Sequence, residues 1–196
     1  MKSWAVVAAV SSMLSVTVPA AHAQAAVWRI DPVHSEMTFR IRHFVTPVRG
    51  SFSKWEGSIT ADPNDLSNGS VKVVVDANSV DTNNERRDAD LRSNNFFATD
   101  SFPTLTFTTT NVDVKGSKVK LSGDLMIRGR TKPVVLEGEY LGIAKGMDGK
   151  DRMGFDVSTK VNRLDFGVSW NRAVEGGGVV LADDVTITIT VEAIKQ

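Results

Sequence analysis

The sequence contains no cysteine, which excludes a disulfide framework, a thiol nucleophile and a cysteine-ligated metal centre. It has only three histidines, and none of the H-E-x-x-H, G-x-S-x-G or P-loop patterns occurs in its 196 residues. No charge of one sign dominates, because 23 basic residues face 23 acidic ones. The balanced charge offers no field that would gather nucleic acid or an anionic membrane surface. These absences count against the common hydrolase, nucleotide-binding and nucleic-acid-binding classes.

The N-terminus has the pattern of a secretory signal peptide. Lys2 precedes an uncharged, mostly apolar run over residues 3–18, and Pro19 and the Ala21-His22-Ala23 cleavage pattern follow. The run is too short to favour a retained membrane-spanning helix. We predict a signal peptide over residues 1–23 and one domain over residues 24–196. Since no second long apolar span occurs, we expect no stable membrane insertion, and export without cysteine indicates the periplasm.

Most of the remaining chain alternates apolar and polar residues with period two, the pattern of half-buried β-strands. Turn chemistry separates these stretches, for example at 62–65 and 67–69. The pattern predicts an all-β fold, either an antiparallel barrel or a two-sheet sandwich. Isolated glycines inside strands favour the barrel, because strongly bent strands use glycine at corners. These glycines are Gly57, Gly123, Gly138 and Gly154, and the predicted strands are 36–44, 50–61, 71–77, 104–114, 118–128, 132–142, 152–161 and 184–193.

The segment 79–103 breaks this alternation. Thr82 and Glu85 have the spacing of a capping box, which predicts a short helix over 83–92 with an Asp88–Arg92 pair on its surface. The helix has almost no apolar face, yet large rings follow it closely. Two interpretations stay open: a polar segment lying across the end of a barrel with its aromatic tail inside, or a helical crossover between two sheets. The rings are Phe96, Phe97 and Phe102.

A series of motifs runs along the chain: Trp28-Arg29-Ile30-Asp31-Pro32-Val33-His34-Ser35, Phe39, His43, Gly50-Ser51-Phe52, Arg87-Asp88 with Leu91 and Phe96-Phe97, Phe102-Pro103, Gly123-Asp124-Leu125-Met126-Ile127-Arg128-Gly129, Arg163-Leu164-Asp165-Phe166-Gly167 and Ala182-Asp183-Asp184-Val185. In content and in order, these motifs resemble those of the YceI-like family. The resemblance implies a lipocalin-like, antiparallel eight-stranded β-barrel that is exported to the periplasm and holds a polyisoprenoid chain in its interior. It implies no established catalysis.

An apolar chain would be held mainly by surface burial, at about 0.8 kcal/mol gross for each buried CH₂. Residues that alternation places on inner faces, together with the aromatic tail, could line such a cavity, or they could fill the core and leave none. The apolar candidates are Phe39, Ile41, Phe52, Trp55, Phe96, Phe97, Phe107, Leu125, Ile127, Phe155 and Phe166, and the polar candidates are His43, Arg87, Asp88 and Arg163.

Polar candidates also have structural interpretations. A buried Arg163 needs a carboxylate, a carbonyl or an anionic ligand, so an interior ion pair with Asp165 or Asp88 competes with a ligand contact. Arg86, Arg87 and Arg92 could pair locally with Asp88 and Asp90. All of these arginines and aspartates lie in two short segments of the chain, 86–92 and 163–165.

An enzyme remains the alternative. It would be a small exported hydrolase or isomerase that uses His34 or His43. A shared metal site is excluded, because nine residues of extended strand separate the two side chains by roughly 30 Å. The leading interpretation is therefore a periplasmic carrier without cofactor, which binds an isoprenoid lipid or an isoprenoid quinone and no nucleic acid. A homodimer is left open.

Overall fold

The computed structural model describes residues 25–173 and 178–196. The signal peptide predicted over residues 1–23 lies outside these ranges. Within them, no helix is both long enough and apolar enough to cross a membrane.

The described residues form strands almost throughout, as the period-two alternation predicts. One short α-helix and two 3-10 helices interrupt them. The elements are β1 (Ala26–Ile30), β2 (Glu36–His43), β3 (Thr46–Phe52), β4 (Trp55–Asp62), β5 (Asp65–Asp76), η1 (Ala77–Ser79), β6 (Val80–Asp81), α1 (Glu85–Arg92), β7 (Thr104–Lys115), β8 (Lys118–Ile127), β9 (Arg130–Lys145), β10 (Asp151–Asn162), η2 (Arg163–Phe166) and β11 (Leu181–Lys195).

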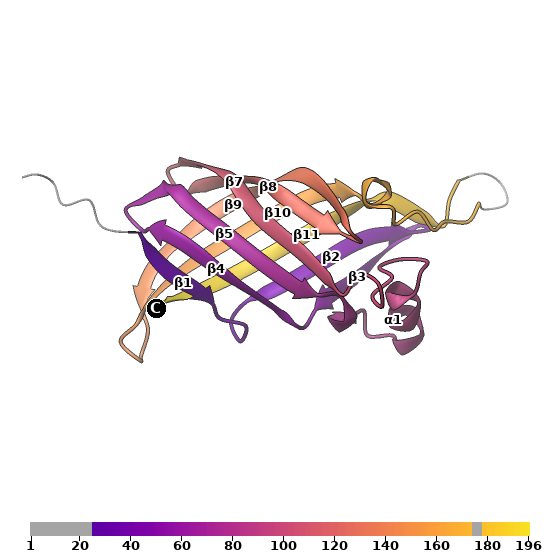
Figure 1. Cartoon of the computed structure of the whole chain (residues 1–196), viewed down its shortest axis with the longest axis horizontal. Coiled ribbons are helices and arrows are strands. Elements are labelled where there is room, and N and C mark those ends of the chain that lie inside the picture. Colours follow the sequence, from indigo (N-terminus) through magenta and orange to yellow (C-terminus); the bar gives the residue numbers. More distant parts are fainter. Residues whose placement is uncertain (1–24, 174–177) are drawn as a thin grey trace, which may run out of the picture.

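The strands close into a barrel, so the sandwich alternative is wrong. Eight of them follow the order β1-β4-β5-β7-β8-β9-β10-β11, and β1 pairs with β11 to complete the ring (Figure 1). Every pairing in the ring is antiparallel. Strand β11 is long enough to pair with β1 through its C-terminal residues and with β2 through the rest. Strands β2, β3 and β6 therefore extend the wall beyond the ring.

The predicted strand over 50–61 is wrong in one respect, because the chain breaks at Ser53 and Lys54 into β3 and β4. At the break, the Ser53 amide donates to the carbonyl of Ser79 rather than to a neighbouring strand. The turn predicted at 67–69 is also wrong, since these residues lie inside β5. Strand β1, which is too short to show clear alternation, was not predicted.

Two of the strand glycines have a physical reason. A Cβ at Gly138 would come within 1.9 Å of the carbonyl oxygen of Asp156 on the next strand, so only glycine permits this approach of β9 to β10. Gly154 lies where the register between β9 and β10 shifts, which is the signature of a bulge. The bulge bends the sheet locally, as barrel closure requires, and Gly138 lets β9 and β10 approach each other closely.

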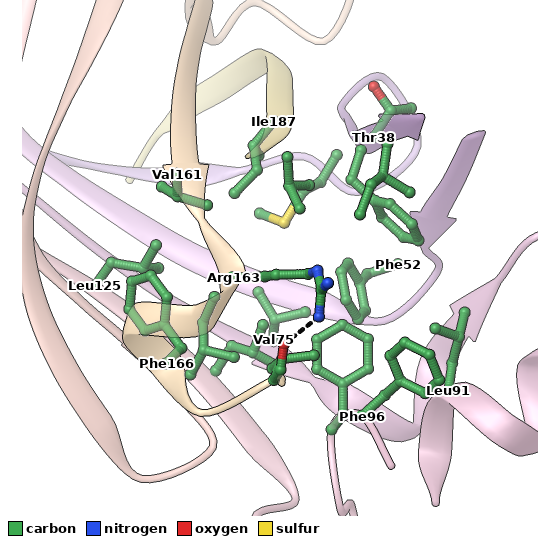
Figure 2. A pocket seen from close by; sticks show the side chains of 18 of the residues that line it. Thr38, Phe52, Val75, Leu91, Phe96, Leu125, Val161, Arg163, Phe166 and Ile187 are labelled. Carbon is green, nitrogen blue, oxygen red and sulfur yellow. Dashed lines mark hydrogen bonds between the residues drawn. The ribbon is translucent and has the colours of Figure 1, made fainter. Parts of the chain in front are cut away.

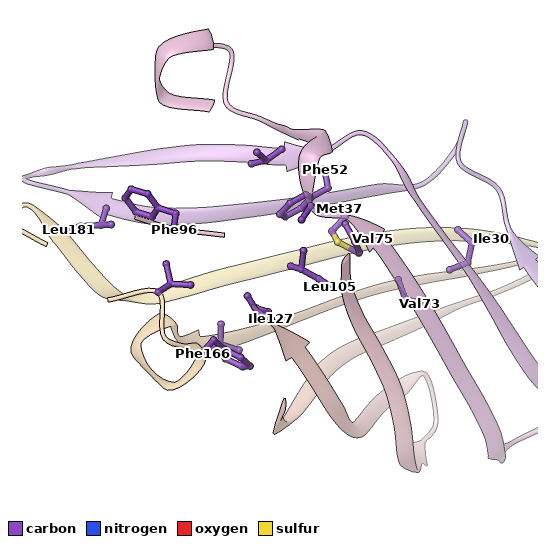
Figure 3. Close-up of a cluster of buried hydrophobic side chains, with 14 residues drawn as sticks. Ile30, Met37, Phe52, Val73, Val75, Phe96, Leu105, Ile127, Phe166 and Leu181 are labelled. Carbon is purple, nitrogen blue, oxygen red and sulfur yellow. The ribbon is translucent and has the colours of Figure 1, made fainter. Parts of the chain in front are cut away.

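The interior is divided along the barrel. At the end formed by β1 and the C-terminus, Trp28, Met153 and Ala193 are fully buried and pack with Ile59 into a plug. The indole N–H of Trp28 donates to the carbonyl of Ala61 at 3.3 Å, which satisfies the one polar atom of that ring. A second, larger cluster occupies the part nearer α1 (Figure 3). This second part contains the cavity described below.

Helix α1 exists as predicted, but it begins differently. Its N-cap is Asn84, whose side chain accepts from the Arg87 amide at 3.0 Å, so the Thr82–Glu85 capping box does not form. The Asp88–Arg92 pair does not form either. Arg92 instead donates to the carbonyls of Asn78 and Val80.

The segment that carries α1 is an excursion from the barrel wall and not a crossover between two sheets. It leaves after β5 and returns as β7, and these two strands are neighbours in the ring. In Figure 1, α1 lies beside β3 at the end opposite the C-terminus. The interpretation of a polar segment lying at the barrel end is therefore confirmed in its placement.

Candidate ligand-binding site

A cavity of about 280 Å³ lies inside the barrel near α1. A single water needs only about 10–15 Å³, so the space is large enough for an organic ligand. Its wall is almost entirely apolar, which favours an apolar occupant over water. The lining residues are Met37, Thr38, Phe39, Ile41, His43, Val48, Phe52, Val73, Val75, Arg87, Asp90, Leu91, Phe96, Phe97, Leu105, Thr106, Phe107, Leu125, Ile127, Val134, Leu136, Thr159, Val161, Arg163, Phe166, Val168, Trp170, Leu181, Val185, Ile187 and Ile189.

Most of the residues predicted from the sequence as candidates lie in this wall. Three do not: Trp55, Asp88 and Phe155. Phe155 points inward, but it packs on Tyr140 at 5.2 Å between ring centres, nearer the plugged end. Trp55 packs against the core around the cavity without lining it, and Asp88 turns to Thr82. Those that do line it are Phe39, Ile41, His43, Phe52, Arg87, Phe96, Phe97, Phe107, Leu125, Ile127, Arg163 and Phe166.

Two kinds of lining residue were not predicted from the sequence. Inner-face aliphatic residues of β5 and β11, such as Val73 and Ile187, were visible in the alternation but not singled out as ligand contacts. Val168 and Trp170 follow η2 in irregular chain, where no periodic signal exists. Only the path of the folded chain brings this second group to the cavity.

Two rings of the aromatic tail, Phe96 and Phe97, fold into the barrel as predicted, but Phe102 does not, because it is 36% exposed and lies outside the cavity lining. Phe97 lies 5.7 Å from Phe52 in an edge-to-face arrangement, and Phe96 lies 5.4 Å from Trp170. The turn that aims these rings is held by the Phe97 amide, which donates to the carbonyl of Leu91 at 2.9 Å. The α1 segment therefore presents polar groups to solvent and aromatic groups to the cavity.

Arg163 is the most buried charge of the wall, with 4% of its surface exposed. Its guanidinium donates to the carbonyls of Ala182, Val168 and Trp170 at 2.8, 2.6 and 2.9 Å, and it pairs with Asp183 at 3.2 Å. Figure 2 shows it pointing between Phe52 and Phe96. The prediction that Arg163 pairs with Asp165 or Asp88 is therefore wrong.

Burial lowers the pKa of the Arg163 guanidinium, and the charge of Asp183 acts in the opposite direction. These contacts use four of the five N–H groups of the side chain. The side chain thus ties η2 to the chain before β11, and its charge is largely compensated before any ligand enters.

Arg87 is held differently, at the surface edge of the same cavity. Its Nε donates to the hydroxyl of Thr82 at 2.7 Å and its Nη2 to the Thr82 carbonyl at 2.7 Å. The Thr82 hydroxyl in turn donates to the buried carboxylate of Asp88. Within the described residues, Nη1 of Arg87 donates no hydrogen bond. The guanidinium is therefore held in place by Nε and Nη2, while Nη1 is available to a ligand.

The two histidines of the described chain lie apart, as the extended spacing predicts. His34 Nδ1 lies 2.8 Å from Asp31 and 3.9 Å from Glu192, away from the cavity, while His43 lines the cavity and packs on Phe44. The Ser35 hydroxyl bonds the backbone of Glu192. Among the described residues, no serine or threonine hydroxyl bonds either imidazole, so no nucleophile–base pair is assembled.

A closed antiparallel barrel with an apolar cavity, a plugged end and a helical segment at the other end defines a class of lipocalin-like barrel proteins. Comparison with known proteins gives the family. The YceI-like domain model matches residues 28–193. This chain belongs to the YceI-like family.

Relatives and solved structures agree with this assignment. A UPF0312 protein of Staphylococcus aureus is 37% identical over 164 residues, which cover 83% of this chain and 94% of the relative. The crystal structure of a YceI protein of Campylobacter jejuni superposes with a TM-score of 0.71 at 30% identity, covering 94% of this chain and 99% of that one. A polyisoprenoid binding domain of Saccharophagus degradans shares the fold, with a TM-score of 0.66 at 16% identity over 88% of this chain and all of that one.

Proposed function

We propose that this protein binds a long apolar lipid, of the polyprenyl or isoprenoid-quinone type, inside the barrel. The observation that carries the proposal is the cavity of about 280 Å³ with an almost wholly apolar wall. A filled core would leave no such space. The polyisoprenoid-binding domain of Saccharophagus degradans, which has the same fold, supports the isoprenoid class of ligand.

The polar groups of the wall limit what the ligand's head can be. The positive charge of Arg163 already faces Asp183 and three carbonyls, so it offers little to an anionic group. Arg87 offers Nη1 at the edge of the cavity, and His43 lies in the wall as well. The apolar chain would therefore lie inside, with its polar end toward Arg87 near the surface.

The proposal extends to location and role. Export through a signal peptide over residues 1–23 would place the domain in the periplasm, where a barrel could transport, store or scavenge a lipid that water does not dissolve. We propose a binding role rather than catalysis, because the described residues place no hydroxyl nucleophile beside His34 or His43. The ligand would be held without a metal or cofactor.

Lipid mass spectrometry of protein purified gently from its native host tests this directly. We expect an isoprenoid lipid to co-purify in a fixed ratio to the protein. Protein that is correctly folded yet repeatedly empty, and whose melting temperature does not respond to added isoprenoids, would contradict the proposal.

A variant that blocks the cavity provides the control. Ile187 is half-buried and points into the cavity (Figure 2). Ile187→Trp should fill empty space, so the fold should survive while the co-purifying lipid disappears. Val135→Trp is the matched change, because Val135 on β9 is exposed and lies outside the cavity lining. It should leave the lipid content unchanged.

A further inference from the structure

The tip of the β2–β3 hairpin has an unusual composition. Residues 40–49 contain three arginines, one histidine and no acidic residue. Arg40, Arg42 and Arg49 are all exposed, and none of them forms an ion pair within the described chain. No ion pair within the described residues therefore neutralises the positive charge of this hairpin.

Two of these arginines oppose each other. Arg40 and Arg49 are direct cross-strand partners in the antiparallel pair of β2 and β3. Like charges in this arrangement destabilise a sheet. Among the described residues, no carboxylate offsets this repulsion by an ion pair with either arginine.

The hairpin also exposes apolar side chains at its end. Val45 is 91% exposed and Phe44 is 44% exposed. Phe44 has a φ of 50°, a left-handed conformation that is uncommon for an aromatic residue. Val179, 41% exposed, belongs to the same surface, because the Phe44 amide donates to the carbonyl of the adjacent Val180 at 2.8 Å.

The same hairpin forms part of the cavity wall. Ile41, His43 and Val48 alternate with the arginines and line the cavity from the inner face. In Figure 1 the hairpin projects at the end of the barrel that carries α1, opposite the plugged end. A surface on which the tip rests would therefore lie next to the part of the barrel that would receive a lipid.

We propose that the hairpin tip, defined here as residues 40–49 with Val179, docks the protein on a membrane surface that bears anionic headgroups. Phe44 and Val45 would enter the interface between headgroups and acyl chains, and the three arginines would meet lipid phosphates. The attraction is local, since the charge of the whole chain is balanced. Apolar side chains next to Lys or Arg are the combination with which peripheral segments bind anionic membrane surfaces.

The purpose of this docking rests on the proposed function, because a lipid carrier must exchange its cargo with a membrane. Its test does not. Vesicle binding can be measured whether or not the cavity is occupied, and cavity binding can be measured without vesicles. A failure of either proposal is therefore recognised separately.

The charge is tested by co-sedimentation with phosphatidylcholine vesicles, with and without phosphatidylglycerol. We expect wild-type protein to sediment with the anionic vesicles and much less with the neutral ones. Each arginine near the surface is worth about fivefold in affinity, so Arg40→Gln/Arg49→Gln should weaken binding by roughly 25-fold. The double variant should fold at least as stably as wild type, because the opposed charges are gone.

The apolar tip is tested by Phe44→Asn/Val45→Ser. Asparagine tolerates the left-handed backbone of residue 44, so the hairpin should keep its shape while vesicle binding falls. Lys118→Gln/Lys120→Gln is the matched control, because it removes the same charge from the start of β8, at the opposite end of the barrel. Vesicle binding should survive this change.

The docking proposal is overturned by any of three results. Wild-type protein could fail to bind anionic vesicles, the control variant could lose binding as strongly as the hairpin variant, or neither hairpin variant could lose it. If the hairpin binds a protein but no anionic vesicle, the docking proposal is overturned in the same way as by the first result.

Discussion

Arg163 shows how one side chain can serve the fold inside an otherwise apolar cavity. Its guanidinium connects η2 with the chain around Val168 and Trp170 and with the start of β11. Without it, three carbonyls would lose their donor in a region that water reaches poorly. Its first role is to hold the irregular chain between β10 and β11 against the barrel.

We predict that Arg163→Met destabilises the protein. A buried carbonyl that loses its donor costs about 1–3 kcal/mol, and of the three acceptors only Val168 is buried, so the free energy of unfolding should fall by roughly 1–3 kcal/mol. Urea denaturation measures this change. Arg163→Lys keeps the charge and part of the hydrogen bonding and should be intermediate. Equal stability of Arg163→Met and wild type would mean that the carbonyls find other donors.

His34 and Asp31 form a pH-dependent pair at the plugged half of the molecule. The hydrogen bond between them raises the pKa of His34 above its ordinary 6.5 and lowers the pKa of Asp31 below its ordinary 3.8. The hydrogen bond from the Val33 amide also lowers the pKa of Asp31. The charge of Glu192 raises the pKa of His34, and the charge of Arg152 lowers it.

The stability that this pair contributes should be confined to a pH window. The histidine's contribution is fully present below 6.5 and is lost as pH rises through the raised folded pKa. The aspartate's contribution is present above 3.8 and is lost as pH falls through the lowered folded pKa. We predict that wild type exceeds His34→Gln in urea midpoint between these values and that the difference shrinks at alkaline pH. If the difference in urea midpoint between wild type and His34→Gln does not vary with pH, the His34–Asp31 pair does not contribute to stability as predicted.

At the scale of elements, the α1 segment is attached to the barrel by a few specific bonds. Asp88 is 6% exposed and accepts from both the amide and the hydroxyl of Thr82. Arg92 reaches the carbonyls of Asn78 and Val80. The helix itself buries only Asp88, so apolar packing comes mainly from the rings behind it. Segments held in this way open more easily than the barrel strands.

We predict that Asp88→Ala speeds ligand exchange. Loss of both acceptor contacts should make opening easier by about 1.4 kcal/mol, which corresponds to roughly tenfold faster release of an apolar fluorescent probe. Association should speed up as well, so the affinity should change little. Stopped-flow fluorescence measures both rates.

Asp100→Ala is the control for this prediction, because Asp100 is an exposed carboxylate of the same segment. It should leave both rates at the wild-type value. Unchanged rates in Asp88→Ala would reduce the segment to a connector between β5 and β7.

At the scale of the whole molecule, the barrel separates a packed half from a hollow half. Trp28 and Met153 are completely buried in the plug, and neither lines the cavity. Stability and ligand capacity are therefore placed in different parts of one sheet. This division allows the cavity to remain open without unfolding the strands that surround it.

We predict that Met153→Ala lowers the free energy of unfolding by about 2–5 kcal/mol, the usual range for such truncations in a core. Affinity for an apolar ligand should be retained, because the cavity wall is untouched. Phe97→Ala, which removes a ring from the wall, should show the opposite balance, with weaker ligand binding and a smaller loss of stability. Denaturation and probe titration of both variants decide whether the two halves are independent.

The sequence by itself determined the fold class and much of the site. Alternation with period two reports which face of a strand is apolar, and this suffices for residues such as Phe39, Ile41 and Leu125. The family motifs, and the aromatic residues Phe96 and Phe97 that follow the predicted helix, supplied the remaining predicted lining residues. These signals are local, so they can be read without knowing where the strands lie in the barrel.

Only the tertiary structure decided what depends on position along the barrel and on contacts between distant segments. Phe155 lies on the inner face, as alternation predicts, but toward the plugged end. Alternation reports the face of a strand and not the position of a residue along the barrel axis, so the sequence could not show this. Asp183 rather than Asp165 neutralises Arg163, and the opposed Arg40 and Arg49 are separated in sequence but adjacent in the hairpin. Strand register and the path of irregular chain fix such pairs, and both result from closing the whole sheet.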